Sequence, residues 1–208
     1  MEKSKGEKPK KEKAIKLGFF QRLKISVIDF DQYHIVAAEG IKKSLVYLLK
    51  LLLIFTIVAT FAAIIKMNEE YKEIIDNFIA LYGEVLAYAM VFITAFLTYF
   101  VTVTIDILAL SMVGFVLSRI IRLPLKFSAV YAMAVSSITL PVFLNIAYII
   151  ANVTTGFTME YFQVMYTLIA YIYMIAALLL MRSNLLKTKF NITTTIHKNN
   201  SGKLDEEE

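Results

Sequence analysis

The sequence predicts an all-α membrane protein, a polytopic bundle of four transmembrane helices with both termini in the cytoplasm. Of the 208 residues, 58% are hydrophobic and the mean hydropathy is +0.64, which is more apolar surface than one soluble core can bury. Several runs that are almost free of charge reach the ~20 residues needed to cross a bilayer. Basic residues gather beside these runs, which indicates membrane topology and not nucleic-acid binding.

The N-terminal part of the chain is polar and then amphipathic. Residues 1–16 are rich in lysine and glutamate and predict a disordered basic cytoplasmic tail. Residues 17–43 mix aromatic and aliphatic side chains with charges, which is typical of a segment at the inner membrane interface. The first span is predicted next, and the mostly acidic residues 67–77 after it are expected outside.

The run 78–118 is long enough for either one span or two. One overlong span is favoured because residues 96–104 contain no Gly, Pro, Asn or Asp to form a turn. One span also places the basic cluster from Arg119 to Lys126 inside, whereas two spans would place it outside. At ~1.5 Å per residue this helix is about twice as long as the hydrocarbon layer is thick, so we expect it to tilt, bend or extend beyond the bilayer.

The rest of the membrane domain, residues 44–182, follows from the same reasoning. The four predicted spans are about 44–65, 80–118, 127–151 and 161–181. Pro141 cannot donate to the carbonyl of Ser137, which predicts a kink in the third span. Residues 183–208 are expected to form a polar cytoplasmic tail. The basic side chains expected to anchor the inner interface are Lys42, Lys43, Lys50, Arg119, Arg122, Lys126 and Arg182.

An ionisable residue inside an apolar run is the main candidate for a functional site. Asp106 lies in the second span, and a charge there is costly unless it faces a bundle interior or a water-filled cavity. Hydroxyl and amide side chains at helical spacing predict a polar seam between the second and third spans. The proposed seam contains Asp106, Thr102, Thr98, Thr94, Thr139, Ser137 and Asn145. Its function is either ion-linked transport or helix association by hydrogen bonds. A further alternative is that Asp106 lies close to the inner interface, if the centre of the bilayer is near Thr94.

Motifs for catalysis and for cofactors are not found in the sequence. The chain has no cysteine, and it contains no Gly-rich phosphate loop, no His–carboxylate metal pattern and no nucleophile elbow. We therefore expect a protein that is not an enzyme and that holds no cofactor or metal. The expected partners are the lipid bilayer and either a membrane transporter or a second copy of the chain, with no nucleic acid.

Three short stretches resemble a known family. They read FFQRLKISVIDFDQY from Phe19, KSLVYLL from Lys43, and KFSAVYAMAVSSITLP from Lys126. Together they resemble the bacterial domain-of-unknown-function family 1189, mostly from Firmicutes and grouped with Yip-like membrane proteins. The resemblance implies a cytoplasmic-membrane protein of unknown role, with maltodextrin-utilisation genes near some members. It brings no catalytic residues, and members often have a longer outer segment than residues 67–77 provide.

Two functions remain open from the sequence. The first is a non-enzymatic accessory or scaffold protein that binds membrane partners or lipids, with a link to sugar uptake suggested by the resemblance. The second is a small proton- or cation-coupled permease or channel that uses the polar seam around Asp106. Small four-span proteins can reach transporter size by dimerising, so the length of the chain does not decide between them.

Overall fold

The described part of the chain is mostly helical and contains no strand. The computed structural model describes residues 17–67 and 69–204, so the predicted tail 1–16 lies outside the described residues. The elements are α1 (Phe19–Val27), the 3-10 helix η1 (Phe30–Gln32), α2 (Tyr33–Ala37), α3 (Ile41–Ile65), α4 (Glu69–Tyr82), α5 (Glu84–Ile120), α6 (Phe127–Ser137), α7 (Thr139–Thr155) and α8 (Phe162–Leu204).

Four helical stretches are long and apolar enough to cross a membrane. They are Ile41–Ile65, Glu84–Ile120, Phe127–Thr155 and Phe162–Lys187. The all-α class and four helices of membrane-spanning length are therefore confirmed.

The overlong second span is a single unbroken helix. Helix α5 has 37 residues, which corresponds to about 55 Å at ~1.5 Å per residue. Helix α5 therefore reaches this length without a break in the helix. The chain turns instead at Gly83, whose φ of +84° is readily adopted only by glycine.

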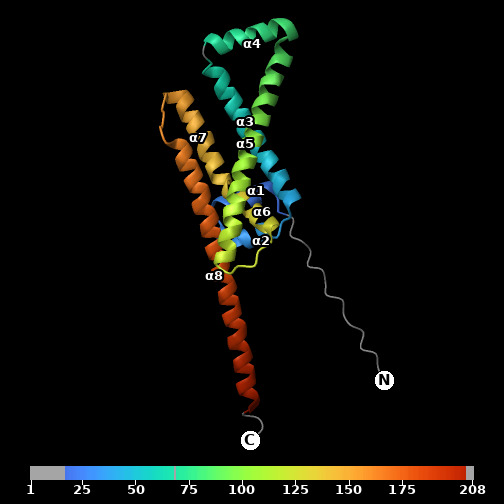
Figure 1. Cartoon of the computed structure of the whole chain (residues 1–208), viewed down its shortest axis with the longest axis vertical. Helices are drawn as coiled ribbons and strands as arrows, with labels where there is room; N and C mark the ends of the chain where they lie inside the picture. Colours follow the sequence, from blue (N-terminus) through green and yellow to red (C-terminus); the bar gives the residue numbers. More distant parts are fainter. Residues whose placement is uncertain (1–16, 68, 205–208) are drawn as a thin grey trace, which may run out of the picture.

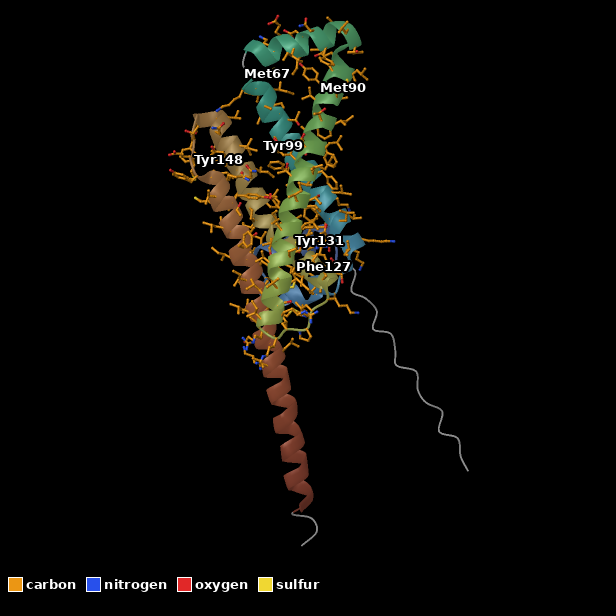
Figure 2. All side chains as sticks on the ribbon, in the orientation of Figure 1. Met67, Met90, Tyr99, Phe127, Tyr131 and Tyr148 are labelled. Atoms are coloured by element: carbon orange, nitrogen blue, oxygen red, sulfur yellow. The ribbon has the colours of Figure 1, made fainter. Side chains whose placement is uncertain are left out.

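Helix α4 connects the C-terminal end of α3 to the N-terminal end of α5 and lies across both ends (Figure 1). The sequence predicted only a short acidic connection here. We call this corner of the molecule, residues 62–90, the outer arch. Figure 2 shows Met67 and Met90 on the arch, with Phe127 and Tyr131 toward the opposite end of the bundle. In Figure 1 the arch extends beyond the turn that joins α7 to α8.

The third span consists of two helices with a break at Ile138, three residues before Pro141. Pro141 occupies the first turn of α7, where backbone N–H groups have no partner within the helix. The hydroxyl of Ser137 donates to the carbonyl of Met133 at 3.0 Å, and that of Thr139 donates to Val135 at 3.4 Å. The interruption between the two helices thus lies within three residues of Pro141, while the kink itself stays a prediction.

Helices α5, α6 and α8 pack closely around Gly114. A Cβ atom at this position would lie 2.3 Å from Cε of Met174 and 3.2 Å from Cγ1 of Val130. The glycine therefore permits close approach of three helices, and it does not bend α5. Helix α8 then continues past its apolar span to Leu204, where the sequence predicted only a polar tail (Figure 1).

Residues 17–40 form a head that packs on the bundle. Its helices α1 and α2 contact α6, and the head also reaches α7 and α8. Ile25, Tyr33 and Val36 are buried, whereas Phe20 is 81% exposed and Ile28 is 72% exposed. The predicted amphipathic segment therefore has one face buried against protein, in addition to the face that is free to contact lipid.

Candidate functional site

The structure brings part of the predicted polar seam around one cavity. Thr98, Thr102 and Asp106 of α5 and Asn145 of α7 line a cavity of about 180 Å³. Two polar residues of α8, Gln163 and Tyr166, also line it. The sequence reasoning missed these two because it compared only the second and third spans.

The seam residues Thr94, Ser137 and Thr139 do not line this cavity. Ser137 and Thr139 are fully buried elsewhere, and the hydroxyl of Thr139 lies 3.1 Å from that of Tyr47 in α3. Ile138, the residue between them, does lie beside Asp106 in a second cavity of about 50 Å³. The two neighbours of Ile138, Ser137 and Thr139, line neither cavity.

Two threonine hydroxyls of the seam donate hydrogen bonds to backbone carbonyls of their own helix. The hydroxyl of Thr98 donates to the carbonyl of Thr94 at 2.9 Å, and that of Thr102 donates to Thr98 at 3.0 Å. Asp106 is partly buried and makes no ion pair with the side chains that the structure describes. No group of three potential metal ligands occurs within the described part of the chain. The cavity can accept a small polar species, with one carboxylate as its charged group.

A second polar cluster, centred on Arg22 of α1, was not predicted. Only 2% of Arg22 is exposed, and its Nη1 forms an ion pair with Oε2 of Glu39 at 2.7 Å. Its Nη2 donates to the hydroxyl of Ser44 at 3.1 Å and to the carbonyl of Ala132 at 3.3 Å. The guanidinium carbon also lies 4.5 Å from the centre of the Tyr47 ring, within the range of a cation–π interaction.

These contacts join the head to α3 and α6 through one buried cation. Burial lowers the pKa of Arg22 below its ordinary value, and the neighbouring charge of Glu39 opposes this shift. A weaker contact, 3.4 Å from Nη2 to the hydroxyl of Ser136, adds a second point on α6. The Nε of Arg22 is buried and has no hydrogen-bond partner among the described residues.

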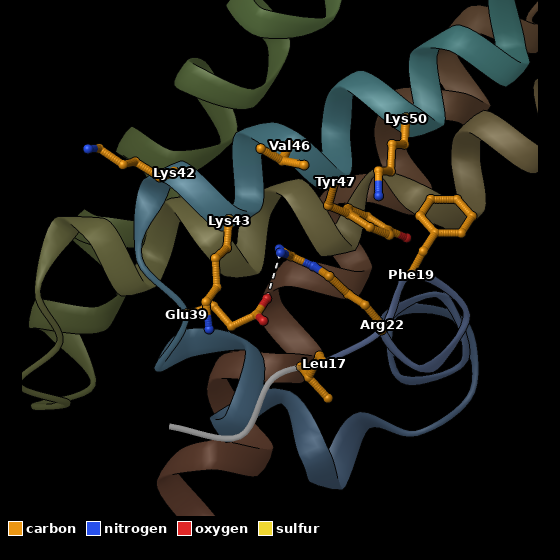
Figure 3. Close-up of a pocket in the computed structure, with 10 residues that line it drawn as sticks. Leu17, Phe19, Arg22, Glu39, Lys42, Lys43, Val46, Tyr47 and Lys50 are labelled. Carbon is orange, nitrogen blue, oxygen red and sulfur yellow. Dashed lines mark hydrogen bonds and ion pairs between the residues drawn. The ribbon is translucent and has the colours of Figure 1, made fainter. Parts of the chain in front are cut away.

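A cavity of about 360 Å³ adjoins this ion pair and is lined on one side by lysines (Figure 3). Lys42, Lys43 and Lys50 of α3 line it together with Arg22 and Glu39. Figure 3 shows Lys43 and Lys50 on the side of α3 that faces Arg22, whereas Lys42 points away. Three lysines that the sequence predicted as separate interface anchors thus line the same cavity.

The other predicted anchors lie elsewhere at the same end of the bundle. Arg119 is in the last turn of α5, and its guanidinium carbon lies 5.0 Å from the centre of the Phe115 ring. Arg122 has a positive φ of 56° in the turn before α6, and Lys126 is the N-cap residue of α6. Arg182 lies near the end of the fourth span. All four are exposed and none lines the cavity beside Arg22, and their role as interface anchors stays a prediction.

Most of the Arg22 cluster and most residues of the lysine-lined cavity fall in one segment of the chain. Residues 20–82 match the DUF1189 family, a protein family of unknown function. The suspected DUF1189 resemblance is confirmed over this segment, which contains most of the head, the first span and α4. The Yip-like grouping and the Firmicutes origin stay predictions. No curated protein and no solved structure matches the chain.

The DUF1189 segment contains Arg22, Glu39, Ser44 and Tyr47, and it also contains the three lysines of the cavity. Asp106 and the rest of the polar seam lie outside it. The sequence analysis placed Arg22 only in an interfacial segment. It could not predict the cluster because the hydrogen-bond partners of Arg22 are 17 to 114 residues away in the sequence. The only signal available was a basic residue on an otherwise amphipathic helix, which is common at membrane surfaces.

Proposed function

We propose that this multipass membrane protein is a non-enzymatic accessory or scaffold protein of the plasma membrane that binds membrane partners or lipids. Its termini are then cytoplasmic, in agreement with the basic residues at the ends of the spans. The suggested link to sugar uptake makes a sugar transporter the first partner to test. Neither an accessory nor a scaffold role requires a catalytic group.

The observation that carries this proposal is the apolar surface of the outer arch. Val85 is 86% exposed and Leu81 is 75% exposed, and Tyr82 and Leu86 beside them are more than half exposed. These residues surround the turn at Gly83, at the tip of the molecule opposite the head (Figure 1). An apolar patch on a protruding corner is typical of a surface that binds another protein or a membrane.

Site-specific photo-crosslinking tests this proposal. A photo-reactive amino acid replaces Val85, and the control carries it at Ile172, which is 60% exposed on the apolar span of α8. We expect one discrete protein adduct from position 85 in native membranes, and lipid adducts from position 172. Leu81→Lys should remove the protein adduct. If position 85 yields only lipid adducts, the arch binds no protein partner and the scaffold role fails.

A second candidate function is a small proton- or cation-coupled permease or channel. The supporting observation is the cavity of about 180 Å³ that contains Asp106 together with Asn145 and Gln163. Reconstituted vesicles should show solute flux that depends on pH and that Asp106→Asn abolishes, with Thr94→Val outside the cavity as the control. Absence of flux with protons, alkali cations and small sugars would reject this function.

A further inference from the structure

We infer that the cavity between the head and α3 binds the phosphate headgroup of an anionic phospholipid. Four basic residues and one acidic residue line the cavity, which gives it a net charge of +3. Glu39 is engaged with Arg22, so its charge is already compensated. The lysines are therefore free to bind an anion.

The cation at the base of the cavity is fixed in position. Arg22 is held by Glu39, Ser44 and Ala132, so its side chain loses little conformational freedom when an anion binds. Its Nε is buried and has no partner among the described residues, so the guanidinium group keeps one unused donor. Arginine donors are well suited to phosphate, and the lysines add positive charge around it.

The spacing of the two lysines on the cavity side also fits one headgroup. Lys43 and Lys50 are seven residues apart on α3, which corresponds to two turns and about 10 Å along the axis. Their long flexible side chains can therefore reach the same phosphate from opposite sides. Val46, which lies between them in the sequence, also lines the cavity and is 52% exposed.

The surroundings favour a lipid over a soluble phosphate. Leu17 and Phe19 contribute apolar walls to the cavity, and the adjacent Phe20 is 81% exposed. Lys50 lies about 14 Å along the first span from its start at Ile41, so this side of the cavity adjoins an apolar stretch long enough to cross a bilayer. Basic pockets beside transmembrane helices are suited to anionic headgroups. A ligand with both a phosphate and acyl chains matches all of these features.

This inference specifies the lipid-binding part of the proposed function, but it does not depend on a protein partner at the outer arch. Loss of a crosslink at the arch would leave the cavity untouched. Conversely, a failure of lipid binding would leave the scaffold role open. The two proposals are therefore tested by separate measurements on opposite ends of the molecule.

Lipid titration of the full chain in detergent tests the inference, with bound lipid counted by native mass spectrometry. The probes are phosphatidylglycerol, phosphatidylcholine and glycerol 3-phosphate. We expect one phosphatidylglycerol to bind more tightly than phosphatidylcholine, and glycerol 3-phosphate to compete only weakly. In the double variant Lys43→Gln/Lys50→Gln we expect affinity for phosphatidylglycerol to fall about thirtyfold, which is about 2 kcal/mol.

Two further variants separate a built site from general surface charge. Lys126→Gln/Arg182→Gln removes the same charge from exposed positions outside the cavity and should bind as the unmodified chain does. Val46→Trp keeps every charge but narrows the cavity, so it should also weaken binding. All variants are first checked for an unchanged melting temperature without lipid.

Three outcomes would overturn the inference. An equal loss of affinity in the Lys126→Gln/Arg182→Gln variant would mean that only overall charge attracts the lipid. Unchanged binding in Val46→Trp would place the lipid outside the cavity. Binding of glycerol 3-phosphate as tight as that of phosphatidylglycerol would make the cavity a site for a soluble phosphate.

Discussion

The buried ion pair between Arg22 and Glu39 is expected to make a large contribution to the attachment of the head. Their side chains are 3% and 5% exposed, so removing either one leaves a charge with little access to water. Loss of one partner from such a pair typically costs about 3–5 kcal/mol, mainly through the charge left behind. We therefore expect Arg22→Met to lower the free energy of unfolding by about 4 kcal/mol, near the middle of that range.

The matched control is Lys24→Met on the same helix. Lys24 is exposed, so the same loss of charge should change the free energy of unfolding by less than about 0.5 kcal/mol. The double variant Arg22→Met/Glu39→Leu removes both buried charges at once. Because no unpaired charge then remains, we expect it to be more stable than Arg22→Met by at least about 2 kcal/mol.

The measurement is reversible unfolding in mixed micelles, in which sodium dodecyl sulfate is increased against a mild detergent and helix content is followed by circular dichroism. The chain has no tryptophan, so a tryptophan introduced into α1 can report separately on release of the head. The reasoning is refuted if Arg22→Met is no more destabilising than Lys24→Met. It is also refuted if the separate effects of Arg22→Met and Glu39→Leu simply add in the double variant.

Three other predictions concern packing, pH and topology. Gly114→Val should destabilise the bundle by about 1–3 kcal/mol because a larger side chain meets Met174. Gly114→Ala should destabilise it less because the Met174 methyl group can move, and thermal unfolding in detergent measures both effects. Burial raises the pKa of Tyr33, so its stabilisation is present below the ordinary tyrosine pKa of about 10 and is lost above it. Unfolding measured from pH 9 to 11 should therefore show a shallower loss of stability in Tyr33→Phe than in the unmodified chain. Because the chain has no cysteine, single cysteines at Asp76 and Arg122 should react with impermeant maleimide from opposite sides of the membrane, and labelling of both from one side would contradict the four-span topology.

The four spans could be predicted because a bilayer sets the length of its helices. A continuous apolar run of the required length has few alternatives, and the basic residues beside it restrict the number of crossings. Helical spacing also predicted that Thr98, Thr102 and Asp106 share a face, and the structure places all three in one cavity. These conclusions depend on local sequence alone.

The parts that could not be predicted depend on contacts between distant residues. Gln163 lies 57 residues after Asp106, and nothing in their local sequence indicates that they line the same cavity. The break at Ile138 decides the surroundings of Ser137 and Thr139, whereas Pro141 indicated only that a break was near. Arg22 resembles many basic residues of interfacial helices, and its burial follows from partners on α3 and α6.

The contacts of Arg22 also set an order of events during synthesis. Its α6 partners Ala132 and Ser136 follow it by 110 and 114 residues. At about 5–20 residues per second, the ribosome needs roughly 6 to 20 s to make the intervening chain. For that time α1 exists without the surface that receives its guanidinium group, and it must wait in the hydrated headgroup region. Helix α1 can thus reach its final place only after the third span has been inserted.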